Sequence, residues 1–427
     1  MPLLGIERLK LSNTDTLLTA GATIISVQGG LGNDFYSVTG AGAVVTDTGG
    51  INTFFLNGVN QTGIGGSGAD TYQIFGANVG EWASGMTIQG GAGLDTLFFQ
   101  PVRPSNPVFS LDLDLGLNTI SGIDRIVFSS PQSPALTNHL TLSDGMMATA
   151  DADQNGTPGD VSIEETNAFA FSDFEIDASE LLAGHAIRFG QNGNFSGNDT
   201  VLGGAGGDLI AGDAGNDSLV GNAGADGLEG GDGNDTITGG EGQDRLIGGS
   251  GGDVLVLSEA TQVQDTIRFD TLFDGSLELN TSVAETTADS VLGFNGVTDR
   301  IELNRAGLGL GAGGVVALAN NGAWNLAAGA VFIMGASDTT TKDDFGLMSN
   351  FAALSTDAAV ATGSTVGHRV LIAVSNVEQA PVRRTGLYVW TDSDGDGVID
   401  ATDGVHLLGV LEGVVSSQLT AADFLRV

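Results

Sequence analysis

The stretch from Asn194 to Val256 repeats one nine-residue pattern seven times without a gap. The pattern is G-G-x-G-x-D-x-U-x, where U is Val, Ile or Leu in every copy. Six glycine-rich residues favour a turn with positive φ, and the next three favour a short strand whose central side chain points inward. Two nonapeptides complete one coil, so the pattern predicts a parallel β-roll over residues 194–256. A glycine-rich flexible linker is the alternative, but a linker holds no aliphatic residue in strict register.

Aspartate occupies position six of every copy, and alternate copies are expected to stack into two rows about 4.8 Å apart. Unit charges at that spacing repel by about 1 kcal/mol in water and by ~3–4 kcal/mol at an effective dielectric constant of 20, so stacking requires a hard cation between turns. Carboxylate and glycine carbonyl oxygens are ligands that Ca²⁺ prefers, and seven repeats offer about five interior sites. The predicted ligands are Asp199, Asp217, Asp235 and Asp253 in one row, Asp208, Asp226 and Asp244 in the other, and the turn glycines Gly204, Gly206, Gly215, Gly224, Gly231, Gly233, Gly240 and Gly242.

These repeats resemble those of the RTX (repeats-in-toxin) family, whose nonapeptides form a calcium-binding parallel β-roll. The segment ADSVLGFNGVTDRIEL (288–303) is similar to the one that commonly follows such repeats and caps the roll. The last residues, with GLYVWTDSDGDG (386–397), resemble the C-terminal module of RTX proteins exported by type I secretion, whose signal is C-terminal and uncleaved. The resemblance implies a secreted, extracellular protein of the surface-layer or adhesin type. Its expected partners are calcium ions, the type I secretion apparatus, and either further copies of itself or a cell-surface glycan.

Near the C-terminus, TDSDGDGVIDATD (391–403) matches an EF-hand-type calcium loop. Gly397 takes loop position 6, where the chain must turn sharply, and Asp replaces the usual Glu at position 12. The strand-like GLYVW before the loop predicts that the helix pair of an EF-hand is missing. A solvated acidic loop is the alternative interpretation. The predicted ligands are Asp392, Asp394, Asp396, the carbonyl of Val398, Asp400 and Asp403.

Weaker calcium signals occur earlier in the chain. The half-patterns GGLGNDFYS (29–37), GGSGADTYQ (65–73) and GGAGLDTLF (90–98) are isolated and unevenly spaced, which suggests an irregular β-solenoid with longer turns. Their aspartates, Asp34, Asp70 and Asp95, either bind calcium or only close a turn. The stretch DADQNGTPGD (151–160) begins like a calcium loop with Asp151, Asp153 and Asn155, but Pro158 breaks its register.

A second pattern occurs three times, in GIERLKL (5–11), GIDRIVF (122–128) and GVTDRIEL (296–303). Each copy has an acid near an arginine, followed by alternating apolar residues. This pattern predicts the start of a strand with an exposed ion pair.

The net charge limits the classes of partner that the chain can bind. It has 52 acidic and 14 basic residues, for a net charge of −38. Such a chain repels nucleic acid and anionic lipid and attracts divalent cations. It has no cysteine, which excludes disulfides and thiolate chemistry. The first residues lack a basic segment followed by an apolar core, and no uncharged apolar run is long enough to cross a bilayer, so neither a Sec signal nor membrane insertion is expected.

No catalytic residue is predicted. The zinc motif H-E-x-x-H is absent, the four histidines are far apart, and G-x-S-x-G occurs only inside the glycine repeat. The sequence therefore predicts a structural, non-enzymatic protein. A secreted hydrolase or lyase with an acid-based site in residues 1–193, or the C-terminal carrier part of such an enzyme, is the alternative. We expect an all-β fold in four segments: an irregular β-solenoid over 1–130, a β-rich connection over 131–193, the calcium-binding β-roll over 194–256, and a capping β domain over 257–427.

Overall fold

The fold of this chain is almost entirely β, as the sequence predicts. The computed structural model describes residues 8–10, 17–20, 26–56, 60–76, 85–101, 111–114, 119–129, 137–144, 159–166, 173–191, 195–257, 259–272, 274, 288–311, 313–318, 329–334, 367–375, 384–396, 403–414 and 418–427. The chain divides into two compact units, one of residues 1–214 with 221–224 and one of residues 215–220 with 225–427. Strand β20 (Ser218–Ala223) spans this division. The prediction of four segments stays a prediction.

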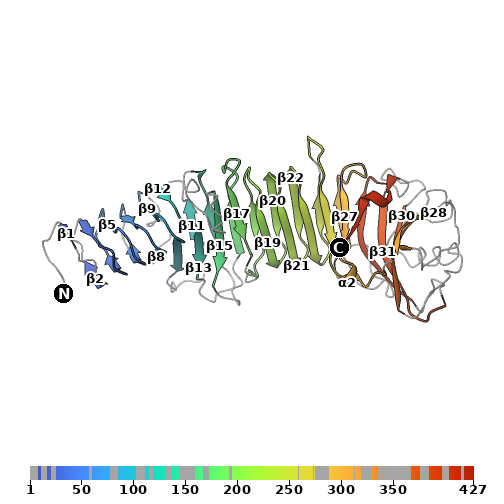
Figure 1. The fold of residues 1–427 in the computed structure, drawn as a ribbon, viewed down its shortest axis with the longest axis horizontal. Coiled ribbons are helices and arrows are strands. Elements are labelled where there is room, and N and C mark those ends of the chain that lie inside the picture. Colours follow the sequence, from blue (N-terminus) through green and yellow to red (C-terminus); the bar gives the residue numbers. More distant parts are fainter. Residues whose placement is uncertain are drawn as a thin grey trace. The chain divides into compact units, whose positions relative to one another are not determined.

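Each coil of the first unit adds one strand to each of two facing stacks of parallel strands (Figure 1). Pairing continues from β13 to β15 across residue 130 without a change of direction. One sheet contains, in order, β1 (Arg8–Lys10), β3 (Ser26–Gln28), β5 (Val44–Thr46), β7 (Thr62–Ile64), β9 (Thr87–Gln89) and β12 (Thr119–Ser121). A second contains β2 (Leu17–Ala20), β4 (Phe35–Val38), β6 (Thr53–Leu56), β8 (Thr71–Gly76), β10 (Thr96–Pro101), β13 (Arg125–Phe128), β15 (Asp160–Glu165), β17 (Ala186–Phe189) and β19 (Leu209–Ala214). A third contains β11 (Leu111–Asp114), β14 (Thr137–Thr141), β16 (Asp173–Asp177) and β18 (Thr200–Leu202).

The second unit continues the same parallel coiling and ends in a partly antiparallel sheet. Strands β30, β31 and β32 pair antiparallel, and β32 joins the coils by pairing parallel to β26. One sheet contains β21 (Gly227–Asp232), β23 (Arg245–Ser250), β25 (Thr266–Phe269), β27 (Arg300–Leu303) and β33 (Phe424–Arg426). The other contains β22 (Thr236–Glu241), β24 (Val254–Val256), β26 (Asp289–Leu292), β32 (Gly404–Glu412), β31 (Arg384–Asp392), β30 (His368–Ser375), β29 (Gly329–Met334) and β28 (Gly314–Leu318). The described helices are α2 (Arg305–Leu308) and the 3₁₀ turn η4 (Ala421–Asp423).

The first two N-terminal half-patterns are joined by two coils of 18 residues, which is the length of two nonapeptides, and the prediction of longer turns there is wrong. Asp34, Asn52 and Asp70 follow one another at intervals of 18 along the chain, and the register runs from Phe35 to Thr53 to Thr71. The sequence pattern does not identify the coil in between, because Asp47 and Thr48 replace the first two glycines and Asn52 replaces the aspartate. From Asp70 to Asp95 the chain makes one extended coil with an interval of 25, since β8 pairs directly with β10.

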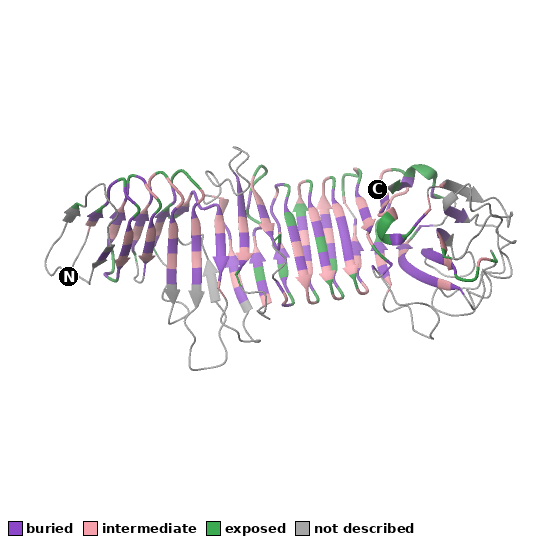
Figure 2. Cartoon of the chain, turned by 60° about the horizontal axis from the view of Figure 1, so that its bottom comes forward, coloured by how far each residue is buried: buried purple, intermediate pink, exposed green. Residues whose placement is uncertain are grey.

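The core lies between the facing sheets and consists of the inward side chain of each short strand. All seven position-eight residues of the nonapeptides are at most 1% exposed, as the repeat predicts: Val201, Ile210, Leu219, Leu228, Ile237, Leu246 and Leu255. In the N-terminal coils, Tyr36, Phe54 and Tyr72 take the same position, with ring centroids 5.2 and 4.7 Å apart. Along the strands, buried residues alternate with partly exposed ones (Figure 2). This alternation fixes the register, because a shift by one residue would turn the apolar row outward.

Candidate metal sites

The position-six aspartates of the second unit lie in two rows that link successive coils. The backbone N–H of Asp217 donates to Oδ1 of Asp235 at 2.8 Å, and the N–H of Asp235 donates to Oδ1 of Asp253 at 2.8 Å. In the other row, the N–H of Asp226 donates to Oδ1 of Asp244 at 3.0 Å. All five residues are buried. Each accepting carboxylate therefore holds the preceding coil by a charge-assisted hydrogen bond, in addition to any role in binding a cation.

The first two repeats use the same device within the first unit. Oδ1 of Asp199 accepts the N–H of Phe174 at 2.8 Å, and Oδ1 of Asp208 accepts the N–H of Ile187 at 2.8 Å. Oδ2 of Asp208 also accepts the N–H of Gly204 at 2.7 Å. These repeats are thus joined to the coils that precede the nonapeptides.

The second carboxylate oxygen is the chemically unusual feature of the rows. Oδ2 of Asp235, Asp244 and Asp253 is buried and has no hydrogen-bond partner within the described part of the chain. A buried acceptor without a donor costs about 1–3 kcal/mol, and more when it is charged. A Cβ atom placed on Gly230 would lie 2.2 Å from Oδ2 of Asp235 and 2.5 Å from the carbonyl oxygen of Gly248. Two oxygens therefore converge beside one glycine, which is an environment that suits a hard divalent cation.

The carbonyl beside Oδ2 of Asp235 belongs to Gly248, which is position one of the repeat two places further along the chain. Two oxygens also converge at Gly203, where a Cβ would lie 2.3 Å from Oδ2 of Asp208 and 2.6 Å from the carbonyl oxygen of Gly221, but here Oδ2 already accepts the N–H of Gly204. The glycines predicted as ligands stand at positions two and four, and the carbonyls of Gly221 and Gly248 at position one were not predicted, because the pattern does not distinguish position one from the other turn glycines. The eight predicted glycines lie in the same turns, and among them Gly233 has φ 151°, which side chains other than glycine rarely adopt.

Three acids outside the nonapeptides extend the rows, and the sequence analysis did not identify them as site residues. The N–H of Asp253 donates to Oδ1 of Asp289 at 3.1 Å. In the other row, the N–H of Asp244 donates to Oδ1 of Asp265 at 2.9 Å, and the N–H of Asp265 donates to Oδ1 of Asp299 at 3.2 Å. Each of the added acids directly precedes a strand of the form polar–aliphatic, as in DTI, DSV and DRI. These three-residue patterns are visible in the sequence, but no G-G-x-G turn precedes them, so they do not match the repeat.

The exposed ion pair predicted for the repeated acid–arginine pattern is wrong. Asp124 is buried, and one of its oxygens accepts the N–H of Asp95 at 2.6 Å. Arg125 instead pairs with Glu164 on the neighbouring strand at 2.5 Å. Asp299 likewise belongs to a row, as described above. The acid precedes its strand in the position-six place, so it faces the adjacent coil while the arginine faces outward. The first copy, GIERLKL, lies largely outside the described residues.

A single row also runs through the N-terminal coils. The N–H of Asp34 donates to Oδ1 of Asn52 at 2.9 Å, and the N–H of Asn52 donates to Oδ1 of Asp70 at 2.8 Å. The row continues with the N–H of Asp70, which donates to Oδ1 of Asp95 at 2.7 Å. The three predicted aspartates thus all close turns between coils, and an asparagine does the same.

Asp34 differs from the other members of this row because the hydroxyl of Tyr36 contacts its side chain. It lies 2.9 Å from Oδ2 of Asp34 and also contacts Oδ2 of Asp47 on the next coil. A Cβ on Gly29 would lie 1.8 Å from this hydroxyl and 2.0 Å from Oδ2 of Asp47. Burial and the two neighbouring carboxylates raise the pKa of Tyr36 far above its ordinary value, so the hydroxyl keeps its proton and donates it.

Asp70 and Asp95 instead share the geometry of the nonapeptides. Oδ2 of each is buried and has no partner among the described residues. A Cβ on Gly65 would lie 2.1 Å from Oδ2 of Asp70 and 2.4 Å from the carbonyl oxygen of Gly90. Burial raises the pKa of Asp70 to about 6 and that of Asp95 to about 7.

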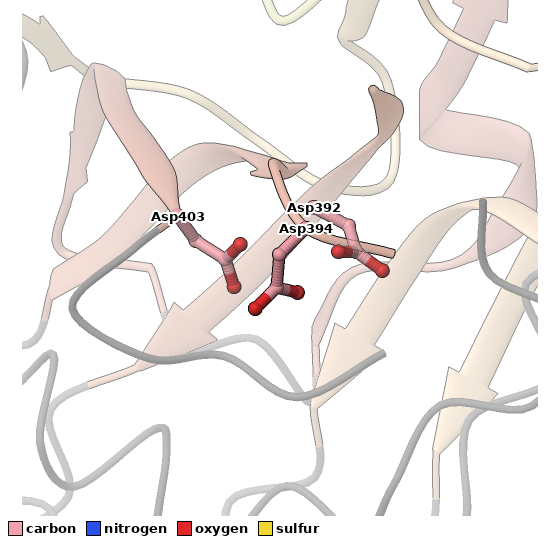
Figure 3. Close-up of side chains that lie close together, drawn as sticks. All are labelled: Asp392, Asp394 and Asp403. Carbon is pink, nitrogen blue, oxygen red and sulfur yellow. The ribbon is translucent and has the colours of Figure 1, made fainter. Parts of the chain in front are cut away.

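The C-terminal loop brings three of its predicted ligands together. One oxygen each of Asp392, Asp394 and Asp403 lies within 4.8 Å of the other two (Figure 3). The indole N–H of Trp390 donates to Oδ2 of Asp403 at 2.8 Å, and the N–H of Ser393 donates to Oδ1 of Asp403 at 2.8 Å, which fixes this carboxylate. The loop connects the antiparallel strands β31 and β32 and has no flanking helices, as expected.

Other predicted ligands are not brought into this cluster. Asp396 is described and exposed, and its N–H donates to Asp394 at 3.1 Å. Val398 and Asp400 lie outside the described residues, as do Asp151, Asp153 and Asn155. These ligand assignments stay predictions.

Burial raises the pKa of several row carboxyls despite the hydrogen bonds that favour their charged form. The pKa of Asp208, Asp235 and Asp253 rises to about 6, and that of Asp265 rises to about 7. Desolvation is the largest cause in each case, and backbone N–H donors oppose it. Without a metal ion, these carboxyls therefore bind protons at nearly neutral pH.

Comparison with known proteins agrees with this geometry. The family model described as RTX calcium-binding nonapeptide repeat (4 copies) matches residues 194–228 and again residues 228–255. No curated protein matches the chain. Within the described residues, no helix is both long enough and apolar enough to cross a bilayer. Residues 194–255 are RTX calcium-binding nonapeptide repeats, and the chain is an RTX-repeat protein.

Proposed function

We propose that this chain is an extracellular calcium-binding protein with a structural or surface-associated role of the surface-layer or adhesin type. It is exported by type I secretion through its C-terminal module and folds when it meets calcium. Proteins with RTX repeats are typically secreted, which supports the localisation. The observation that carries the proposal is the set of buried carboxylate oxygens without a hydrogen-bond donor, since a divalent cation would satisfy them.

The energetics support a fold that depends on calcium. A site contributes about 2.7 kcal/mol when free calcium exceeds its dissociation constant a hundredfold. About five such sites would contribute on the order of 13 kcal/mol, as much as the net stability of a typical domain. At the low free calcium of a cytosol the repeats would stay unfolded and suited to export, and millimolar calcium outside the cell would fold them.

The same criterion assigns the remaining candidate sites. Asp70 and Asp95 would bind calcium, because each combines an oxygen that lacks a donor with a nearby carbonyl in the manner of the nonapeptides. Asp34 would only close its turn: its Oδ1 also lacks a donor among the described residues, but the Tyr36 hydroxyl and Oδ2 of Asp47, rather than a carbonyl oxygen, lie beside Gly29. The loop that contains Asp392 and Asp403 would bind one further ion.

We infer a non-enzymatic role from where the perturbed acids lie. Catalytic carboxyls are recognised by strongly shifted pKa values within a cleft. Here the described carboxyls whose pKa rises to about 6 or 7 belong to the rows between coils, where backbone N–H groups already bind one oxygen. Their shifts follow from burial in a stacked fold, so they need no substrate to explain them.

Far-UV circular dichroism during a calcium titration tests the proposal. We expect a largely disordered spectrum in EGTA and a β-sheet spectrum at millimolar calcium. Light scattering under both conditions tests the surface role, for which calcium-dependent assembly is the expected result. A complete β-sheet signal in chelator would refute calcium-dependent folding, and a monomer at all calcium concentrations would argue against self-assembly.

A further inference from the structure

The described part of the coils from residue 26 to residue 100 has no exposed charged side chain. Its only charged residues are four aspartates, each at most 5% exposed: Asp34, Asp47, Asp70 and Asp95. In the nonapeptides, by contrast, Glu229 and Asp232 are exposed. A chain with a net charge of −38 thus presents a neutral surface on these N-terminal coils.

The outward side chains of β4, β6, β8 and β10 form two rows on this neutral surface, which we call the aromatic face. The strand register gives the first row as Phe35, Thr53, Thr71 and Thr96, and the second row as Ser37, Phe55, Gln73 and Phe98. All eight residues are partly exposed. The rings of Phe35 and Phe55 lie side by side, with their centroids 4.6 Å apart, so the aromatic area extends across both rows.

The phenylalanines of the aromatic face are not explained by the fold. An outward position on a coil needs only a residue that tolerates water, and the nonapeptides hold Ser218, Glu229 and Thr236 at such positions. The core is already complete on the inner side of the same strands, where the flanking residues of each phenylalanine are buried. Partly exposed rings gathered on one face therefore indicate a contact surface.

The chemistry of the aromatic face matches an uncharged polysaccharide. A hexose ring has an apolar C–H face that packs on an aromatic ring, and hydroxyls that hydrogen bond with amide and hydroxyl groups. Gln73 lies between Phe55 and Phe98 in the second row, and three threonines stand beside them in the first row. Anionic polymers and further copies of this acidic chain are repelled by the protein as a whole, whereas an uncharged chain is not.

The spacing of the rows favours an extended, β-1,4-linked chain. Neighbouring strands lie about 4.8 Å apart, so each row offers one side chain at every such step. A β-1,4-linked hexose chain advances by about the same distance per ring and turns each ring over relative to the one before. Every second ring therefore presents the same face, which fits Phe55 and Phe98, because they lie two strands apart with β8 between them.

We propose that the aromatic face binds an uncharged β-1,4-linked polysaccharide that runs across the strands. The rings of Phe55 and Phe98 pack on alternate sugars, and Gln73 with the threonine row hydrogen bonds to the hydroxyls. The inference rests on the proposed surface-associated function and names the partner of that surface. Calcium holds the coils of the roll together, and the uncharged coils make the contact.

Affinity electrophoresis of the full chain in millimolar calcium tests the proposal. The probe is hydroxyethyl cellulose, a soluble uncharged β-1,4-glucan, and carboxymethyl cellulose provides the same backbone with negative charges. We expect hydroxyethyl cellulose in the gel to retard the wild type and carboxymethyl cellulose to retard it much less. No retardation by hydroxyethyl cellulose, or stronger retardation by the charged polymer, would overturn the proposal.

Variants of the two rings assign the binding to the aromatic face. We expect the double variant Phe55→Ala with Phe98→Ala to bind hydroxyethyl cellulose at least about tenfold more weakly than the wild type. The matched control is Leu209→Ala, which removes a 37% exposed apolar side chain from the outer side of β19, and it should bind like the wild type. Equal losses in the double variant and the control would contradict the assignment.

A second double variant, Phe55→Leu with Phe98→Leu, guards against misfolding. Leucine keeps an apolar side chain at each position but lacks the flat ring, so this variant should fold normally by circular dichroism in calcium and still bind weakly. Wild-type affinity in it would refute ring packing. Self-association that is lost in both double variants, without polysaccharide binding by the wild type, would assign the face to a second copy and overturn the proposal.

The proposed function and this inference fail separately. A wild type that folds on calcium addition but is not retarded by hydroxyethyl cellulose would refute the polysaccharide site alone. A β-sheet spectrum that is already complete in EGTA would refute calcium-dependent folding, whatever the gels show.

Discussion

Replacing Asp235 by asparagine removes one buried charge from the middle of a row and keeps its hydrogen bond to the preceding coil. The amide oxygen can still accept the N–H of Asp217, which lies 2.8 Å from Oδ1. The amide nitrogen would replace Oδ2, which now has no donor and faces the carbonyl of Gly248. An amide N–H beside that carbonyl can form a hydrogen bond, whereas a carboxylate oxygen there is repelled. The substitution therefore removes an unfavourable contact whenever calcium is absent.

The size of the effect follows from the raised pKa of Asp235. Burial raises this pKa from 3.8 to about 6, and each pKa unit corresponds to about 1.4 kcal/mol of free energy. Water at the edge of the coil screens part of this cost, so we expect Asp235→Asn to increase the metal-free stability at pH 8 by about 1–2 kcal/mol. In saturating calcium the variant loses about 2.7 kcal/mol of binding linkage, so its stability falls below that of the wild type.

Circular dichroism measures both values: folding induced by a stabilising osmolyte gives the metal-free stability in EGTA, and chemical denaturation gives the stability in millimolar calcium. Glu229→Gln is a matched control, because it removes one exposed charge from the adjoining repeat and should change stability little in either condition. If Asp235→Asn destabilised the protein equally with and without calcium, the carboxylate would be acting only as a structural link. The reasoning from the second oxygen would then be refuted.

Three further outcomes follow from the same contacts. The pKa values of Asp95 and Asp265 are raised from 3.8 to about 7 by burial, so the metal-free native state holds protons that the unfolded chain releases. Osmolyte-induced folding in EGTA should therefore show stability falling as pH rises from 4 to 8, and a rise over this range would contradict the shifts. Tyr36→Phe removes the one hydroxyl donor that Oδ2 of Asp34 and Oδ2 of Asp47 share and should lower the stability of the N-terminal coils in calcium by about 1–3 kcal/mol, measured by hydrogen exchange of their amides; unchanged protection would show that the hydroxyl is dispensable. Asp403→Asn should abolish any calcium-dependent change in the emission of Trp390, which donates to this carboxylate, while the circular dichroism of the repeats is unaltered; a retained response would place the ion elsewhere.

The regular part of this fold could be predicted from the sequence because its period is local. Each nonapeptide contains a whole turn and strand, so Leu246 or Asp244 can be placed from its immediate neighbours. The continuation of the rows could not, since Asp265 and Asp289 follow insertions of unequal length and no glycine turn announces them. Asn52 could not be predicted for a different reason: its coil has the expected length and register, but asparagine replaces the aspartate of the pattern.

The ion-pair prediction failed for a related reason. A sequence shows that an acid and an arginine are adjacent, as in Asp124 and Arg125, but neighbours on a strand point to opposite faces. The partner of each is therefore set by the coil beside it: Asp124 bonds to the backbone of Asp95, and Arg125 bonds to Glu164. Those partners are far away along the chain, and only the stacking of coils brings them into contact.

The side chain at position six can hydrogen bond to the adjacent coil and can offer an oxygen to a cation. The rows show that the first function occurs without the second. Asn52 joins coils through its Oδ1 and has no carboxylate to offer a cation. Asp299 has a carboxylate, but both of its oxygens already accept N–H groups. Asp235 and Asp253 keep one buried oxygen without a donor among the described residues, and there folding leaves a charge that the protein does not compensate. An aspartate in a row is therefore insufficient for calcium dependence, because a carboxylate whose two oxygens both have protein donors, as at Asp299, needs no cation.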